Sequence, residues 1–303
     1  MKNILSYVNG LLDNEVLEVK MTDSEKIDVA RIVPFILMHL SVFLVIFSGF
    51  SWAGLALCAF SYLIRMFAIT AFYHRYFSHK TFKTSRPVQF FFAFLACSST
   101  QRGPIWWAAH HRQHHKHSDQ AEDTHSPVQH SFWWSHMGWF LCQKNFPTNK
   151  RFVQDWLKFK ELNWLNRYDW IAPVIYALFI SFCGWICENY FPALGLTCAQ
   201  ALVWGFFVST VILYHGTFLI NSLSHVYGTR PFETKDESRN NPWLAIITLG
   251  EGWHNNHHYF PNTIRQGFRP GEFDPTYWGL WLMAKFKLIH SCRELPAHIK
   301  KQL

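Results

Sequence analysis

Histidine carries most of the chemistry that this sequence could perform. The 303-residue chain contains 18 histidines, and several fall into groups with regular spacing. HRQHH at 111–115 and HNNHH at 254–258 share the pattern i, i+3, i+4, which directs three imidazoles to one face of a helix. Two copies of one pattern predict two walls of a metal site. The histidines concerned are His111, His114, His115, His254, His257 and His258.

Three further histidines extend this set to nine. His74 and His79 lie in HRYFSH, and His225 ends NSLSH with Asn221 four residues before it on the same helical face. Two side chains that are five positions apart do not lie on the same face of an α-helix. We therefore expect the helix to end between His74 and His79. A structural zinc takes four ligands and a catalytic zinc usually three. Nine imidazoles therefore predict two metal ions with higher coordination numbers.

The elements that position these histidines are membrane helices. Charged residues make up 16% of the chain, against roughly 25% in ordinary soluble domains. Apolar runs at 32–50, 52–73, 170–191 and 201–221 are each long enough to cross about 30 Å of hydrocarbon as a helix. The shorter run at 87–100 suits a buried or interfacial helix. The sequence predicts an all-α integral membrane protein with four transmembrane helices and a cytosolic helical cap.

Basic residues predict which side of the membrane each segment faces. Segments 1–31, 74–169 and 224–303 hold four, thirteen and ten Lys or Arg, while the connections at 51 and 192–200 hold none. Cytoplasmic loops retain these residues, so both termini and the histidine groups should be cytoplasmic, in a bacterial inner membrane or the endoplasmic reticulum. Topology and anionic lipid head groups then explain the net charge of +8 without nucleic-acid binding. The predicted segments are 1–31 (cytosolic), 32–73 (helices 1 and 2), 74–169 (cap), 170–223 (helices 3 and 4) and 224–303 (cytosolic).

The ligand type leaves the metal open, because imidazole suits zinc, copper, iron and nickel. A histidine-rich metal pair at the mouth of a membrane cavity is suited to binding dioxygen and abstracting hydrogen from an unactivated carbon, and iron is the usual metal for that chemistry. Nearby carboxylates could accept the second ring N–H of each ligand and fix its tautomer. The candidates are Asp119, Glu122, Asp123 and Glu251.

The histidine groups resemble the boxes of membrane fatty acyl desaturases of the stearoyl-CoA Δ9 type. HRYFSH, WWAAHHRQHH, NSLSH and GEGWHNNHHYFP occur in the family's order over about residues 50–265, and GTRPF and FWWSHMGW also fit. The resemblance implies two non-haem irons that use O2 and two electrons to insert a cis double bond, expected at Δ9, into a saturated long-chain acyl group. The implied ligands are His74, His79, His111, His114, His115, His225, His254, His257 and His258, with Asn221 reaching iron through a water.

The same resemblance implies a bent substrate tunnel. Gln101, Trp107 and Thr217 match the residues that shape its bend, and Tyr62 matches a bulky residue that closes its far end. Such a tunnel would place one pair of methylenes beside the metals and limit the acyl chain to about the length of stearate.

The acyl-carrier site departs from the family. Where the animal enzymes have Arg-Asp before the second box, this chain has Ala109-His110, and Gln143 replaces one of two further basic residues. Lys144 keeps the other, and Arg102 replaces an Asn, so Lys144 and Arg102 are the candidate carrier contacts. Acyl-CoA is the favoured substrate, with acyl carrier protein or membrane phospholipid as alternatives. Electrons are expected from a separate donor: a cytochrome b5-type protein, a ferredoxin or a rubredoxin.

Two other functions fit parts of the pattern. A membrane hydroxylase or alkane monooxygenase would have similar boxes but return an alcohol in place of an alkene. A metal transporter or sensor would also use histidine clusters, but transporters hold ligands at mid-membrane within broken helices, whereas these boxes lie just outside the spans. His39 and His215 fall inside spans but outside the boxes, and we expect them to be hydrogen-bonded structural residues.

Overall fold

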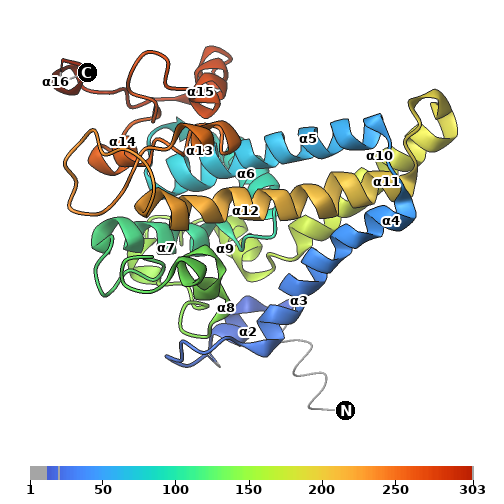
Figure 1. Cartoon of the computed structure of the whole chain (residues 1–303), viewed down its shortest axis with the longest axis horizontal. Coiled ribbons are helices and arrows are strands. Elements are labelled where there is room, and N and C mark those ends of the chain that lie inside the picture. The colour runs from blue at the N-terminus through green and yellow to red at the C-terminus, as the bar shows by residue number, and fades with distance from the viewer. Residues whose placement is uncertain (1–11, 20, 302–303) are drawn as a thin grey trace.

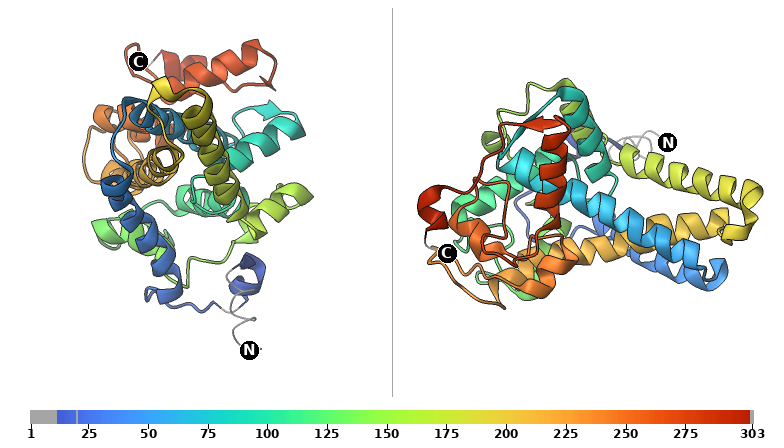
Figure 2. Two further views of the ribbon diagram at one scale, coloured as in Figure 1. Left: turned by 90° about the vertical axis from the view of Figure 1, so that its right-hand side faces the viewer. Right: turned by 90° about the horizontal axis from the view of Figure 1, so that it is seen from above.

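Four helical segments of the chain are long and apolar enough to cross a membrane. The computed structural model describes residues 12–19 and 21–301, so residues 1–11 of the predicted N-terminal segment lie outside the description. The four segments extend in one direction from a head that contains most of the other helices (Figures 1 and 2). They confirm the predicted all-α membrane fold. Their bounds are Arg31–Ser48, Trp52–Ser78, Ile171–Tyr190 and Cys198–His225.

Polar caps and one glycine mark the ends of the first helical hairpin. The Asp28 carboxylate accepts a hydrogen bond from the Arg31 N–H, the Ser51 hydroxyl accepts one from the Gly54 N–H, and Gly49 at φ +75° ends the first span. The first hairpin consists of α3 (Val29–Leu40), η1 (Ser41–Leu44), α4 (Val45–Ser48), α5 (Trp52–Phe67) and the π-helix η2 (Ala68–Ser78). The second consists of α10 (Ile171–Tyr190), η5 (Pro192–Leu194), α11 (Cys198–Leu202), the π-helix η6 (Val203–Val208), α12 (Ser209–Ser222) and η7 (Leu223–His225).

The head joins the middle of the chain to its C-terminal part. Its helices and strands are α2 (Asn14–Glu18), β1 (Lys83–Thr84), α6 (Arg86–Cys97), α7 (Pro104–His117), η3 (Trp134–Gly138), α8 (Trp139–Leu141), η4 (Lys150–Phe152), α9 (Lys160–Arg167), α13 (Pro242–Ile247), α14 (His254–Tyr259), α15 (Pro275–Lys285), β2 (Ile289–His290) and α16 (Ala297–Lys300). Strands β1 and β2 pair antiparallel, with Lys83 opposite His290. This pairing ties the segment after the second span to the end of the chain.

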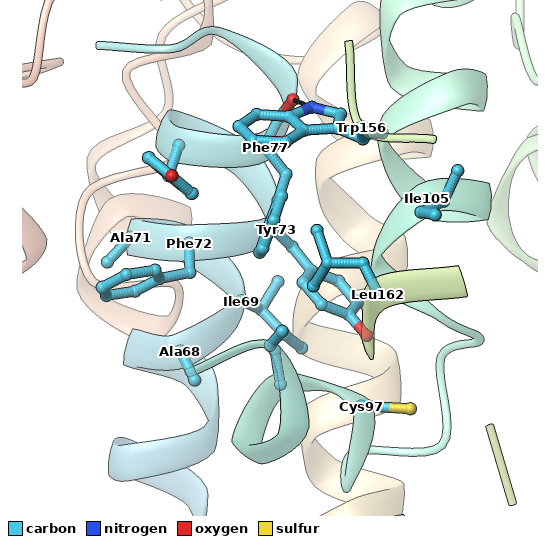
Figure 3. Packing of buried hydrophobic residues seen from close by; sticks show 14 of the residues in the cluster. Ala68, Ile69, Ala71, Phe72, Tyr73, Phe77, Cys97, Ile105, Trp156 and Leu162 are labelled. Atoms are coloured by element: carbon cyan, nitrogen blue, oxygen red, sulfur yellow. Dashed lines mark hydrogen bonds between the residues drawn. The ribbon is translucent and has the colours of Figure 1, made fainter. Parts of the chain in front are cut away.

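The main apolar core lies where the second span enters the head. Side chains from η2, α6, α7 and α9 meet there (Figure 3). The rings of Phe72 and Phe92 stack with centroids 4.1 Å apart, and the Trp156 indole N–H donates to the Phe77 carbonyl at 2.8 Å. Helix α6, the predicted short helix at 87–100, has 12 residues and packs in this core. The core therefore fixes the helix end that carries His74.

The helix that carries His74 ends at Ser78, between His74 and His79 as predicted, and its last segment is a π-helix. The π-helix η2 continues to Ser78, and the His79 N–H donates to the His74 carbonyl at 3.3 Å. In an i→i+5 ladder, residues five apart lie one turn apart. The two imidazoles therefore meet edge to face, with ring centroids 5.0 Å apart.

The two intramembrane histidines are hydrogen-bonded, as predicted. His39 Nε2 lies 3.2 Å from His215 Nε2, and His215 Nδ1 lies 3.0 Å from His136 Nε2. His136 Nδ1 in turn contacts the Ser222 hydroxyl at 3.0 Å. This row of rings links the first span, the fourth span and η3.

Candidate metal centre

The structure brings all nine predicted histidines together in two groups. Within each group, one ring nitrogen from every histidine lies within 4.8 Å of all the others. The first group, cluster A, consists of His74, His79, His111, His115 and His257. The second group, cluster B, consists of His114, His225, His254 and His258.

Cluster A joins the end of the second span to helices α7 and α14. His74 Nε2 lies 3.0 Å from His257 Nε2, which lies 2.8 Å from His115 Nε2. His79 Nε2 lies 2.8 Å from His111 Nε2. Nitrogens from three separate elements therefore converge on one small volume, as ligands of one cation do.

Cluster B joins the end of the fourth span to the same two helices. His225 Nε2 lies 3.0 Å from His254 Nε2. The rings of His114 and His258 lie beside them, with centroids 5.2 Å apart. Each i, i+3, i+4 triplet is thus shared between the clusters: His111 and His115 enter cluster A, and His114 enters cluster B. Helices α7 and α14 therefore hold the two clusters next to each other.

Carboxylates contact the outward ring nitrogens of four of these histidines. His114 Nδ1 lies 2.9 Å from Asp123, His225 Nδ1 lies 2.9 Å from Asp119, and His258 Nδ1 lies 2.7 Å from Asp236. His74 Nδ1 contacts Glu251. An acceptor at Nδ1 places the ring proton there and leaves Nε2 free to bind a metal.

The sequence therefore predicted three of these four carboxylates. Asp119, Asp123 and Glu251 lie behind cluster histidines as expected. The prediction for Glu122 is wrong, because its side chain is 64% exposed and lies 4.0 Å from His117, which is outside both clusters. Asp236 was missed, because it lies in the irregular loop after His225, where no helical spacing relates it to His258.

Burial keeps most of these imidazoles neutral, which is the form that binds metals. Burial and the neighbouring rings lower the pKa of five histidines well below the usual value: His79, His111, His115, His254 and His257. At His114 the carboxylate of Asp123 outweighs burial and raises the pKa. Burial raises the pKa of Asp119, but the hydrogen bond from His225 and the other contacts of this carboxylate outweigh burial and lower its pKa to about 2.

We predict that an Asp236→Asn variant loses metal from cluster B and turns over roughly 10- to 100-fold more slowly. The amide can still accept from His258 Nδ1, but it supplies no negative charge behind the ring. Metal content by mass spectrometry and the rate of the purified protein check this. Glu233→Gln, at an exposed position of the same loop, is the matched control. Equal metal content in the two variants would show that the contact is only structural.

A cavity of about 410 Å³ lies against the clusters. His74, His111, His114 and His254 line it, as does Asn221. This volume falls within the ordinary range of ligand pockets. The clusters are therefore open to a bound molecule.

The three residues expected at the tunnel bend lie in the cavity wall. The Gln101 amide donates to the Thr217 hydroxyl at 2.8 Å, and the Trp107 indole stacks on the His111 ring. Thr100 and Arg102, on either side of Gln101, have φ values of +59° and +70°. Non-glycine residues in this region are strained, and such strain is common at functional sites. The turn between α6 and α7 therefore presents Gln101 to the cavity.

Tyr62 and Lys144 do not line this cavity. The Tyr62 hydroxyl donates to the Ile247 carbonyl at 2.6 Å and lies beside Gly216, the neighbour of Thr217. Lys144 pairs with Glu25 at 2.6 Å on the surface. Tyr62 is thus close to the cavity wall, whereas Lys144 forms an exposed ion pair and is not part of the cavity wall.

Polar residues also line this cavity, in a part that we call its polar end. Asn14, Arg31, Arg102 and Asp169 line it together with His110. His110 was expected on the surface or behind a ligand, but it is buried in the wall, and burial lowers its pKa to about 3. The sequence did not predict a site role for Arg31, because a basic residue at the start of a membrane span usually marks only the orientation of the span.

Comparison with known proteins agrees with this architecture. A family model described as fatty acid desaturase matches residues 50–266. The chain is 36% identical over 262 residues to a probable chloroplastic lipid desaturase of Arabidopsis thaliana, covering 86% of this chain and 67% of that protein. It is 33% identical over 240 residues to an sn-2 palmitoyl-lipid 9-desaturase of Nostoc, covering 77% and 79%. It is 31% identical over 264 residues to an acyl-CoA C20 Delta5-desaturase of Anemone leveillei, covering 84% and 78%.

The chain therefore belongs to the fatty acid desaturase family: it is a membrane oxidoreductase that acts on fatty acyl chains.

Proposed function

We propose that clusters A and B hold two iron ions, and that the enzyme uses them with O2 to insert a cis double bond at Δ9 of a saturated acyl chain. The observation that carries this proposal is the convergence of nine histidines, in two adjacent groups, on one cavity. Relatives named as 9-desaturases support the position of the double bond. The long-chain substrate would come from the surrounding bilayer.

The donor set fits a pair of redox-active metals. Neutral imidazoles suit iron, copper and zinc, but zinc has no redox chemistry and desaturation removes two electrons from the substrate. When bound, the two irons would activate O2 for the removal of two hydrogen atoms. Asn221, which lines the cavity near cluster B, would reach its metal through a water.

The side chains of the cavity would determine which carbons react. In the proposed tunnel a chain would bend against Trp107 and the Gln101–Thr217 pair, which stacking and hydrogen bonding hold in place. Holding one methylene pair next to the clusters would fix the orientation of the reacting carbons, so that only this pair reacts. The apolar wall, which includes Phe35, Phe140 and Phe218, would exclude water from the rest of the chain.

The acyl carrier and the electron donor complete the proposal. An acyl-lipid suits this enzyme better than acyl-CoA, because Lys144 is paired with Glu25 outside the cavity wall and several relatives are named as lipid desaturases. Electrons would come from a separate cytochrome b5-type protein, ferredoxin or rubredoxin. The basic residues of segments 74–169 and 224–303 would face the cytoplasm and attract an acidic donor.

Expression in a host that lacks its own desaturase tests the proposed function. We expect a new cis alkene at Δ9 in the phospholipid pool, and gas chromatography with mass spectrometry gives both the position and the pool. A hydroxylated chain would identify a hydroxylase, and unchanged lipids despite a folded, metal-loaded protein would contradict the proposal.

We predict that Tyr62→Ala raises the yield of products longer than 18 carbons. The ring fills space beside Gly216, next to the cavity residue Thr217, so its removal lengthens the volume open to the chain end. Tyr62→Phe, which loses only the hydrogen bond to Ile247, should keep the normal profile. The product distribution from a mixture of acyl lengths is the measurement. An unchanged profile in Tyr62→Ala would place the end of the tunnel elsewhere.

A further inference from the structure

Two arginines meet on one aromatic ring at the polar end of the cavity. The guanidinium carbons of Arg31 and Arg102 lie 4.0 Å and 3.9 Å from the centre of the Phe146 ring. Both arginines line the cavity. Because like charges repel, two guanidinium groups sharing one phenyl ring create a strongly positive site unless an anion lies between them.

The residues that the structure describes supply too few acceptors for this pair. Arg102 Nε lies 3.5 Å from Asp169, and Nη1 donates to the Asn14 side chain at 2.8 Å. Nη2 is buried and has no acceptor within residues 12–19 and 21–301. Arg31 donates through Nη1 to the Cys142 carbonyl at 3.5 Å, a long contact. Asp169 is the one carboxylate among the lining residues at this end. One lining carboxylate therefore faces two guanidinium groups, while Asp28 accepts from the backbone N–H of Arg31, and a buried Arg102 N–H donor is left unused by the described residues.

The position of the site relative to the membrane indicates where an anion that binds these arginines would come from. Arg31 is the first residue of the first span, and Trp170, which also lines the cavity, directly precedes the third. The site thus lies at the level of the lipid head groups, where tryptophan is typical. Guanidinium groups bind phosphate with charge-assisted hydrogen bonds.

We propose that Arg31 and Arg102 bind the head-group phosphate of a glycerophospholipid whose acyl chain extends through the cavity to clusters A and B. The Phe146 ring would hold the two guanidinium groups in place through cation–π contacts. This inference rests on the proposed function, since it assigns the carrier of the acyl chain that the clusters would desaturate.

Binding of defined lipids to the full-length protein in detergent tests the site. The probes are distearoyl phosphatidylglycerol, the uncharged distearoyl monogalactosyl diacylglycerol, and stearoyl-CoA. We expect Arg31→Gln and Arg102→Gln each to weaken phosphatidylglycerol binding roughly 10- to 100-fold, and to leave binding of the galactolipid unchanged. Arg31→Lys should retain part of the affinity because it keeps the charge. Arg86→Gln is the control, because Arg86 is 66% exposed and pairs with Glu161.

Each other outcome has a defined meaning. Equal losses for the charged and uncharged lipids, or no loss for either, would overturn the proposal. Arginine-dependent binding of stearoyl-CoA alone would overturn the phospholipid as the source of the phosphate. The two proposals can also fail separately. If phosphatidylglycerol binding depends on the arginines but the metal-loaded protein forms no alkene, the phosphate site is supported and the desaturase proposal is rejected. Thermal midpoints without lipid confirm that each variant is folded.

Discussion

A His257→Ala variant is expected to lose the metal of cluster A and to form no detectable alkene. His257 Nε2 lies within 3.0 Å of the ligand nitrogens of both His74 and His115, so it occupies the middle of the cluster. Its removal leaves four imidazoles around an enlarged space. Loss of one metal of a pair should abolish the reaction rather than slow it, because both metals would act on the same O2.

Metal content per chain and alkene formation are measured on the same preparation. We expect about half of the wild-type metal, because cluster B keeps its four histidines. His298→Ala removes an exposed histidine of α16 and should change neither quantity. Wild-type turnover in His257→Ala would reject the assignment of cluster A as a reaction site.

An Arg75→Met variant is expected to destabilise the protein by about 3–5 kcal/mol. Arg75 is fully buried and lies between two carboxylates: Nη2 lies 3.0 Å from Glu251 and 2.8 Å from Asp274. Nη1 donates to the Ile264 carbonyl at 2.6 Å. Burial favours the neutral form of Glu251, but its contacts with His74 and Arg75 lower its pKa. Without Arg75, two carboxylates would be buried with too few partners.

The thermal midpoint of the metal-free protein measures this loss separately from metal binding. Arg86→Met is the matched control, since Arg86 forms an exposed pair with Glu161, and exposed ion pairs contribute little to stability. We expect a midpoint several degrees lower in Arg75→Met alone. Equal midpoints in the two variants would mean that the interaction between Arg75 and its carboxylates does not hold the C-terminal segment to the second span.

The nine cluster histidines could be predicted because two independent patterns agreed. Helical spacing placed three imidazoles on one face at 111–115 and again at 254–258. The distribution of Lys and Arg placed all the groups on one side of the membrane. The division into clusters could not be predicted, because it depends on how α7 and α14 cross.

Other features of the site could not be predicted from the sequence, because they depend on irregular backbone. The meeting of His74 and His79 requires a π-helix, for which the residues of HRYFSH give no distinctive signal. Asp236 contacts His258 from a loop whose path follows from the fold rather than from spacing. Glu122 is close to His114 in sequence, but its side chain is exposed, and its neighbour Asp123 contacts His114.

The cavity was partly predictable by resemblance. Gln101, Trp107 and Thr217 lie in its wall as expected. The polar end was not predictable, because Arg31, Arg102 and Phe146 come from three separate segments and meet only in the folded chain. The carrier recognition that we propose therefore depends on tertiary structure, and Lys144, the residue kept from the family pattern, is paired with Glu25.

The mass of the product formed by the purified, iron-loaded protein tests the central claim most directly. The protein is supplied with stearoyl phospholipid, O2 and a reducing system, and its product is compared with that of His257→Ala. We predict an acyl chain lighter by two hydrogen atoms, with the double bond at Δ9, from the wild-type protein and none from the variant. A chain heavier by one oxygen atom, or an alkene formed equally by both proteins, would contradict the account.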